Sequence, residues 1–246
     1  MTLPKSSHKK AKNLILVSIS VNICNFHATK TLLFMKKWVF LACALLLFTV
    51  GPYAQKKITY GASAGVTFAS QTTKIEKEKV DKSDTRTGFT VGVFLDYMYN
   101  KIFSFQPGIS FVQKGAKGEA GGYGYENTLN YVELPLNFIA RVKAGKKHKF
   151  LFGAGPWFAM GLSGKSKLTK NGSSKTSDIY FGTDNSKNDY RKFDLGGNVL
   201  GGIQLANGFF LSGNLNFGLN NINFKDNKKL INNYYGIKIG YLIPRK

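Results

Sequence analysis

Few residues of this 246-residue chain could carry acid–base or nucleophilic chemistry. The three histidines are His8, His27 and His148, and the two cysteines are Cys24 and Cys43. A catalytic nucleophile needs a base beside it, and a zinc site needs several His or Cys ligands at close spacing. Only His148 lies beyond residue 54, in the basic run Lys146–Lys149. The sequence therefore predicts no catalytic site, no metal site and no cofactor.

Two further patterns resemble ligand sites but lack the required spacing. The acids Asp178, Asp184 and Asp189 do not follow the spacing of a calcium-binding loop. The glycine-rich run at 115–124 lacks the pattern of a phosphate-binding loop. We interpret both as parts of polar loops, so the elements on either side of these loops must explain the protein.

Residues 1–54 read as a leader rather than as part of the fold, because they hold seven lysines and no acid. A basic start at Met35-Lys36-Lys37 precedes the apolar run Trp38–Val50 and the small residue Ala54. This order is typical of a secretory signal peptide, and the apolar run is too short to span a bilayer as a helix. We expect a mis-called extension at 1–34, a signal peptide at 35–54 and one folded domain at 55–246. A long signal anchor that uses Leu14–Cys24 is the alternative.

Beyond the leader, apolar and polar residues alternate with a period of two, which is the pattern of strands with two different faces. In one segment Phe89, Val91 and Val93 alternate with Thr90 and Gly92. Segments of roughly 10–13 residues have the length of tilted strands that cross a bilayer. The eight segments are Ile58–Phe68, Gly88–Tyr99, Ile102–Gln113, Tyr131–Lys143, Lys149–Leu162, Phe193–Leu205, Phe209–Leu219 and Asn233–Ile243.

The connections between these segments alternate in length. The short ones are Asn100-Lys101, Ala144–His148 and Ala206-Asn207, and the long polar ones are Gln71–Arg86, Lys114–Asn127, Gly164–Arg191 and Asn221–Asn232. Short turns at one end and long loops at the other are typical of outer-membrane barrels. The sequence thus predicts an all-β fold, an eight-stranded antiparallel up-and-down transmembrane β-barrel.

A soluble barrel such as a lipocalin is the rival architecture, with its apolar face turned inward. Two features favour the membrane barrel. The polar face is rich in Gly, Ser and Thr, which fit the crowded interior of a small barrel. Aromatic residues also gather near the ends of the segments, as in an interfacial girdle. The girdle candidates are Tyr97, Tyr99, Phe103, Tyr131, Tyr235 and Tyr241.

Charged residues on the polar face would point into the lumen. They are Asp96, Glu133, Arg141, Asp194 and Lys238. Unpaired charges in a narrow interior are costly, so we expect them to form a polar network that closes the barrel. The alternative functions are a proton or ion path, and a narrow passive pore for small solutes.

The formal charge of +22 suggests nucleic acid as a partner, but its distribution argues against this. Seven of the charges belong to the leader, and most of the remaining +15 lies in loops. We therefore expect outer membrane lipids as partners and no nucleic acid. Loop lysines are candidate contacts to lipopolysaccharide phosphates, although a solvated loop is the alternative. They are Lys165, Lys167, Lys170 and Lys175.

The phrase Tyr-Val-Glu-Leu-Pro-Leu at Tyr131–Leu136 resembles the fourth strand of the PorT-like outer-membrane β-barrel family, which is common in Bacteroidetes. Supporting phrases lie at Gln106–Phe111, Phe152–Pro156 and Gly236–Tyr241, so the resemblance covers about 58–243. It implies a monomeric, non-enzymatic barrel of the outer membrane with a structural or interaction role in the cell envelope. The family's founding member is associated with type IX secretion, so the resemblance also implies envelope or secretion proteins as partners.

Overall fold

The computed structural model describes residues 58–75, 80–145, 147–184, 187–224 and 228–244. They all lie in one unit, Lys57–Lys246. The expected extension and signal peptide lie outside the described residues. Within the described part, no helix is long and apolar enough to span a membrane.

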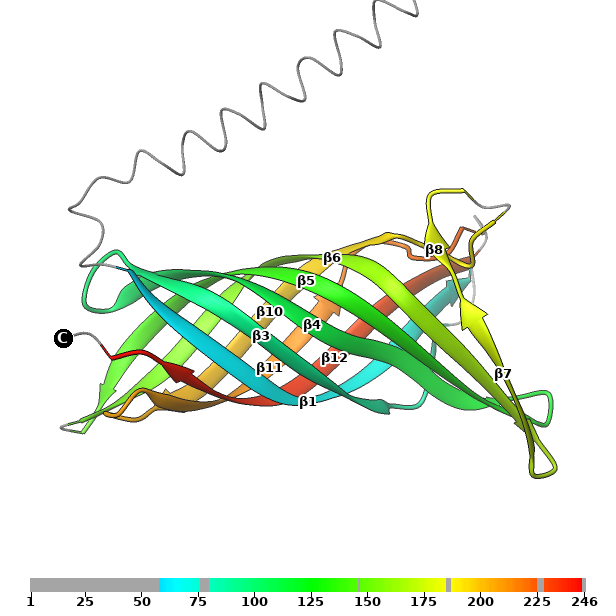
Figure 1. The fold of residues 1–246 in the computed structure, drawn as a ribbon, viewed down its shortest axis with the longest axis horizontal. Helices are drawn as coiled ribbons and strands as arrows, with labels where there is room; N and C mark the ends of the chain where they lie inside the picture. The colour runs from blue at the N-terminus through cyan, green and yellow to red at the C-terminus, as the bar shows by residue number, and fades with distance from the viewer. Residues whose placement is uncertain (1–57, 76–79, 146, 185–186, 225–227, 245–246) are drawn as a thin grey trace, which may run out of the picture. The chain divides into compact units, whose positions relative to one another are not determined.

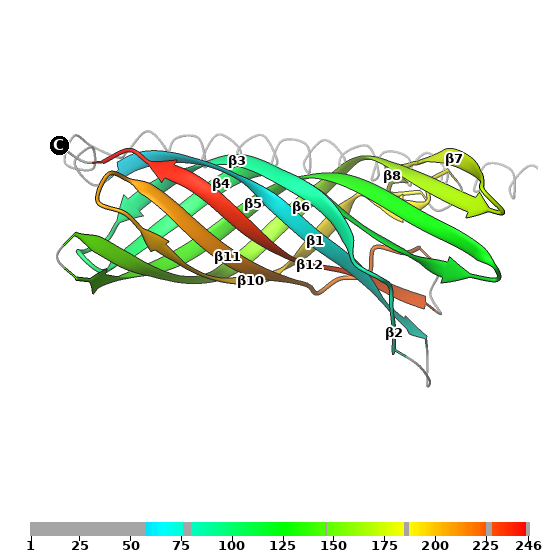
Figure 2. The same ribbon diagram turned by 90° about the horizontal axis from the view of Figure 1, so that it is seen from below.

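Eight strands form a closed antiparallel ring, as the alternation predicts (Figures 1 and 2). In ring order they are β1 (Ile58–Ile75), β3 (Arg86–Met98), β4 (Phe103–Ala120), β5 (Tyr123–Ala144), β6 (His148–Lys170), β10 (Phe193–Gln204), β11 (Phe209–Gly218) and β12 (Lys228–Leu242). The first and last strands, β1 and β12, pair from Gly61↔Leu242 to Ile75↔Lys228 and close the ring. The closure leaves no edge within the ring, which is what a lipid environment requires of β-structure.

Four short strands lie outside the ring. They are β2 (Val80–Lys82), β7 (Ser173–Ile179), β8 (Phe181–Gly182) and β9 (Tyr190–Arg191). β2 pairs with β1, β7 pairs with β6, and β8 pairs with β9 in parallel. Figure 1 shows β7 and β8 at the end of the barrel opposite the end of β12.

The end of the barrel that holds the short turns β3–β4, β5–β6 and β10–β11 is called the turn end. In the first turn, Asn100 Oδ1 accepts hydrogen bonds from the backbone N–H groups of Ile102 (2.9 Å) and Phe103 (2.7 Å). Gly145 and Gly208 adopt φ of 68° and 96° in the other two turns, a region that glycine enters without steric cost. The turn chemistry thus fixes which strands are neighbours.

The opposite end, called the loop end, is more regular than the sequence predicts. The loop expected at Lys114–Asn127 is instead a continuation of β4 and β5 to a tight turn at Gly121-Gly122. The loop expected at Gly164–Arg191 likewise contains the end of β6 and all of β7, joined at Asn171-Gly172. All four turn residues have positive φ, as two-residue hairpin turns of this type require. The polar composition of these two segments predicted loops. The dipeptides Gly121-Gly122 and Asn171-Gly172 instead form the turns of two hairpins.

The two faces of the ring strands differ in the expected sense. Outward side chains such as Val93 and Ile237 are more than half exposed, whereas inward ones such as Thr67 and Asn216 are buried. Apolar side chains therefore face the lipid, and polar ones fill the lumen. Tyr131 corrects the predicted girdle, because it lies fully buried inside the barrel. Its odd position on β5 places it on the same face as Glu133, which the alternation itself indicates.

Candidate functional site

The lumen is crossed by a buried ion cluster that the sequence analysis only half anticipated. Lys114 of β4 is fully buried, and its Nζ lies 3.0 Å from Glu133 Oε2 and 3.5 Å from Asp194 Oδ2. Glu133 comes from β5 and Asp194 from β10, so one cation joins three strands. Two carboxylates at such close range need a cation between them, because like charges repel strongly where water is excluded.

Aromatic rings complete the environment of the Lys114 ammonium group. Its Nζ lies 3.7 Å from the ring centroid of Trp157, 4.9 Å from that of Tyr131 and 5.2 Å from that of Tyr234. A cation over an aromatic face is attracted to the ring quadrupole, most strongly when water is absent. The rings thus supply part of the solvation that the ammonium group loses on burial.

Hydrogen bonds fix the carboxylates of this cluster. The Tyr234 hydroxyl donates to Glu133 Oε1 at 2.6 Å. Asn232 Nδ2 donates to Asp194 Oδ2 at 2.9 Å and to the Tyr131 hydroxyl at 3.2 Å. We call Lys114, Glu133, Asp194, Asn232 and Tyr234 the Lys114 cluster. Because it is charge-bearing, buried and held from several strands, it closes the barrel.

A second cluster lies nearer the turn end, around Arg141 of β5. Arg141 Nη2 lies 2.9 Å from Asp96 Oδ1, and its Nε donates to Gln204 Oε1 at 3.3 Å. Arg141 Nη1 donates to Ser104, and Gln106 Nε2 donates to Asp96 Oδ1 at 3.0 Å. These five residues are called the Arg141 cluster. The guanidinium fork suits this position because it donates in several fixed directions at once.

The five interior residues expected from the sequence therefore fall into two groups and one separate residue. Asp96 and Arg141 meet each other, and Glu133 and Asp194 meet through Lys114. Lys238 joins neither cluster through an ion pair or hydrogen bond among the described residues, and it lines an internal cavity of about 80 Å³. That cavity is large and polar enough for water, which would solvate the ammonium group.

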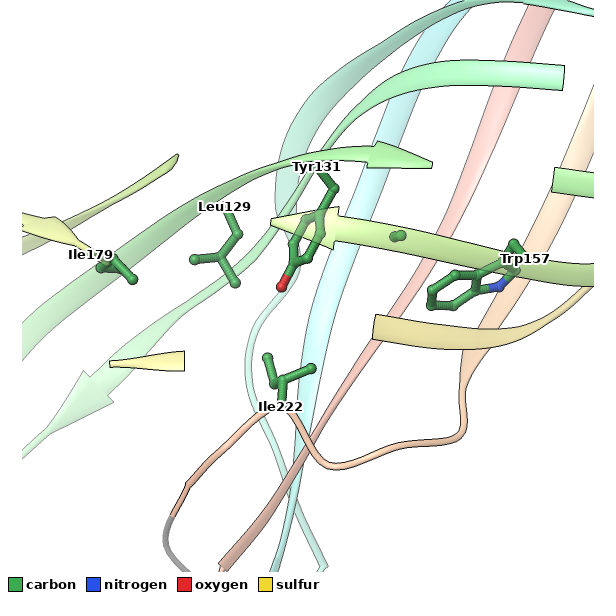
Figure 3. Close-up of a cluster of buried hydrophobic side chains, with 6 residues drawn as sticks. Leu129, Tyr131, Trp157, Ile179 and Ile222 are labelled. Carbon is green, nitrogen blue, oxygen red and sulfur yellow. The ribbon is translucent and has the colours of Figure 1, made fainter. Parts of the chain in front are cut away.

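An apolar cap covers the Lys114 cluster on the loop-end side. Figure 3 shows side chains from β5, β6, β7 and the segment between β11 and β12 that meet there. The cap comprises the buried residues Leu129, Tyr131, Trp157, Ala159, Ile179 and Ile222, with Phe181, Tyr190 and Leu230 against them. Ile222 is held by two backbone hydrogen bonds, Arg191 N–H to Ile222 O at 2.8 Å and Ile222 N–H to Leu230 O at 3.0 Å. The chain thus folds back into the mouth and seals it.

Past the cap, β4 to β7 continue side by side as an outer sheet. A β-bulge sets which side chains face which way, because Tyr131 pairs with Gly161 whereas Asn130 pairs with Ser163. Leu162 is the extra residue, so the alternation of β6 shifts there. A Cβ on Gly161 or on Gly164 would meet cap residues, Phe181 in one case and Ile179 in the other. Gly161 and Gly164 therefore both face the interior, and this fixes which side chains of β6 point inward beyond the bulge.

The four loop lysines lie on two different faces of this sheet. Lys165 and Lys167 alternate with Gly164, so they share the side of the lipid-facing Met160 and Leu162. They pair across strands with Asp178 and Glu126 respectively.

The other two lysines lie on the opposite face. Lys175 lies opposite Leu168, and Lys170 Nζ donates to the Tyr123 hydroxyl at 3.0 Å. The lysines are therefore two pairs rather than one patch.

The residues singled out for chemistry do not converge. His148 lies exposed at the turn end, at the start of β6. Within the described residues, no group of three or more His, Cys, Asp or Glu side chains is placed to hold a metal ion. Asp178 and Asp189 do line one recess, at the loop end.

Lys114 is the central residue that sequence reasoning missed. A signal was present, because the inward positions of β4 run Ser104, Gln106, Gly108, Ser110, Val112 and then Lys114. Continuing this alternation by one step places the ammonium group in the lumen opposite the inward acids.

Comparisons with known proteins identify one family model and several solved structures that resemble this chain. A family model described as an outer membrane protein beta-barrel domain matches residues 53–223. No curated protein sequence matches the chain. Among solved structures, Ail of Yersinia pestis is 14% identical with a TM-score of 0.37, covering 74% of this chain and 98% of that one. OprG of Pseudomonas aeruginosa is 12% identical with a TM-score of 0.39, covering 75% and 95%.

The family match begins before β1 and ends after β11, so it takes in seven of the eight ring strands. The closed ring, the lipid-facing apolar side chains and the polar lumen are what such a domain requires. The chain therefore belongs to the outer membrane protein beta-barrel domain family.

Proposed function

We propose that this outer-membrane protein is a closed, monomeric and non-enzymatic barrel that acts through its outer surface in interactions at the cell envelope. In barrels of this class the short turns face the periplasm and the long connections face outward. One observation carries the proposal: the lumen is filled by two charged clusters and an apolar cap, while β4 to β7 continue outward beyond the ring. The clusters and the cap occupy the space that an open pore would leave for water, and the extended strands form additional surface at the loop end.

The closed lumen argues against the alternative of a narrow passive pore. A solute would have to displace Ile222 and Trp157 of the cap and then pass the Lys114 ion pairs. Separating a buried charge from its partners costs several kcal/mol, of order 3–5.

Conductance in planar bilayers tests this closure. We expect the full-length refolded protein to insert without stable single-channel steps, because the apolar cap and the Lys114 ion pairs fill the lumen. A porin of known conductance, inserted under the same conditions, is the positive control. Regular steps above the lipid baseline, reproduced in independent preparations, would contradict the closed barrel.

For the outer surface, we propose that Lys165 and Lys167 contact lipopolysaccharide phosphates. These two lysines lie on the lipid-facing side of β6, just beyond the exposed apolar residue Leu162. Asp178 and Glu126 lie opposite them and reduce the local positive charge, so the contribution is modest. Lysines near an anionic membrane surface contribute about 1 kcal/mol each.

The double variant Lys165→Gln/Lys167→Gln should therefore bind lipopolysaccharide about fivefold more weakly. This loss of affinity is smaller than two surface lysines would give without the acids opposite them. Lys170→Gln/Lys175→Gln is the matched control, since it removes the same charge from the other face of the same hairpin. Binding is measured by titrating detergent-refolded protein with purified lipopolysaccharide, native and dephosphorylated. Equal losses in the two double variants, or none with either, would refute the assignment.

The PorT-like resemblance offers a finer proposal, a role in type IX secretion. The residues that carry it, however, serve the barrel structure, because Tyr131 and Glu133 point into the lumen and contact Lys114. These two residues therefore stabilise the interior of the barrel, where a secretion partner could not contact them. An altered set of secreted proteins in a deletion strain would favour the secretion role; an unchanged set would exclude it.

A further inference from the structure

A recess of about 640 Å³ opens on the outer side of the cap. It lies between the β6–β7 hairpin and the segments at residues 188–190, 223–224 and 228–230. We call it the vestibule. Its volume falls in the range of small-molecule sites, and the mouth of a β-barrel is one of the places where such sites occur.

The floor of the vestibule is the cap itself. Ile179, Tyr190 and Leu230 line the recess and also belong to the cap, so the vestibule is closed toward the lumen. A ligand would enter from outside the cell and stay there. The recess therefore has the form of a binding site rather than of a channel entrance.

Polar side chains on its walls are held in fixed orientations by the backbone. Asp189 Oδ2 accepts a hydrogen bond from Tyr180 N–H at 2.9 Å. Asn188 Nδ2 donates to Asp184 O at 2.8 Å, and Asn223 Nδ2 donates to Lys228 O at 3.2 Å. Such preorganisation lowers the entropy lost on binding. A carboxylate has about four acceptor positions, so Asp189 can accept further hydrogen bonds from a ligand.

The charge of the vestibule differs from that of the surrounding loops. Among the described residues, the carboxylate of Asp189 faces it together with the ammonium group of Lys228, whereas Asp178 lies opposite Lys165 on the outer face of the hairpin. An anionic ligand would meet repulsion at the Asp189 carboxylate. Burial, with Asp189 and Tyr125 nearby, raises the pKa of the Tyr190 phenol, so this group stays protonated at neutral pH. The walls thus offer many acceptors and amide groups with little net charge.

Two aromatic residues, Tyr190 and Phe224, add apolar surface to these walls. An aromatic face packs well against the C–H face of a sugar ring, while acids and amides hydrogen-bond to its hydroxyls. Aromatic residues combine a large apolar area with, in tyrosine, a polar end.

From this combination we propose that the vestibule binds a short, uncharged oligosaccharide. The inference deepens the proposed interaction role and rests on it.

Titration of the full-length protein, refolded in a detergent without a sugar headgroup, tests the proposal. The probes are neutral trisaccharides of glucose, N-acetylglucosamine, galactose and mannose, with a sulfated disaccharide for contrast. We expect at least one neutral probe to bind with a Kd of about 1 mM or tighter. Asp189→Asn should weaken it about tenfold, as expected for a lost hydrogen bond to a charged group. Asp189→Asn keeps an oxygen for Tyr180 N–H, so the fold should survive.

Asp84→Asn removes a loop-end acid that does not line the vestibule, and it should leave binding unchanged. Saturation-transfer NMR should show the sugar C–H protons close to aromatic rings, with a weaker signal in Phe224→Leu. Failure of every neutral probe, tighter binding of the sulfated disaccharide, or equal binding by all variants would each overturn the proposal. Conductance and lipopolysaccharide binding are measured separately, so the proposed function and this inference can fail independently.

Discussion

Lys114→Met is expected to lower the free energy of unfolding by about 3–5 kcal/mol, because it removes the cation that pairs with two buried carboxylates. Glu133 and Asp194 would then lie close together in the lumen without the ammonium group that pairs with both of them. The contact between the ammonium group and the Trp157 ring would be lost as well. Methionine roughly matches the length of the lysine chain, so the loss is mainly electrostatic. Urea unfolding in detergent micelles, followed by Trp157 fluorescence, measures the change.

Two further variants separate this effect from general damage to the strand. Lys117→Met changes an exposed lysine on the same strand and should stay within about 0.5 kcal/mol of the parent. The triple variant Lys114→Met/Glu133→Gln/Asp194→Asn removes both uncompensated charges and should recover most of the loss. If Lys114→Met is as stable as Lys117→Met, the Lys114 cluster does not hold the barrel together.

The ring itself was predictable because lipid imposes a simple rule on it. Every residue of a crossing strand faces either lipid or lumen, so the period of two repeats without interruption. Residues such as Val93 and Ile237 on one face, and Asp96 and Glu133 on the other, follow this rule and lie where the alternation places them. The inward acids were therefore identifiable from the sequence alone.

Beyond the bilayer the rule weakens, and this is where prediction failed. Outside the membrane both faces of a strand meet water, so Ser, Lys and Thr suit either face and the continuation of β4 to β7 reads as loop. The dipeptides Gly121-Gly122 and Asn171-Gly172 were the remaining signal for hairpins. The bulge at Leu162 also shifted the alternation, so sequence spacing alone could not show that the four loop lysines divide between two faces.

The cap and the vestibule were further from prediction because they depend on contacts between distant segments. Ile222 reaches the cap by backbone hydrogen bonds to Arg191 and Leu230, and it meets Leu129 and Ile179 from other strands. In the sequence it lies between asparagines, in the run Asn220-Asn221-Ile222-Asn223. Nothing in its neighbours indicates burial, since the determining partners are supplied by the closed ring.

Arg141→Met should cost about 3–5 kcal/mol of unfolding free energy, by the same mechanism at the other end of the lumen. The variant removes the cation beside the buried Asp96 carboxylate and leaves Ser104 and Gln204 without a donor that they share. Gln106 still donates to Asp96, but a neutral amide cannot balance its charge. The measurement is again urea unfolding in micelles, supported by the mobility shift between heated and unheated gel samples.

Asp96→Asn/Arg141→Met is the informative control for Arg141→Met, because it removes both charges and should be more stable than the single variant. The Arg141 and Lys114 clusters share no residue, so the losses in Lys114→Met/Arg141→Met should add to within about 0.5 kcal/mol. A combined loss well below the sum would show that the two clusters act as one network. A single variant of parental stability would show that the Arg141–Asp96 pair is dispensable for the stability of the barrel.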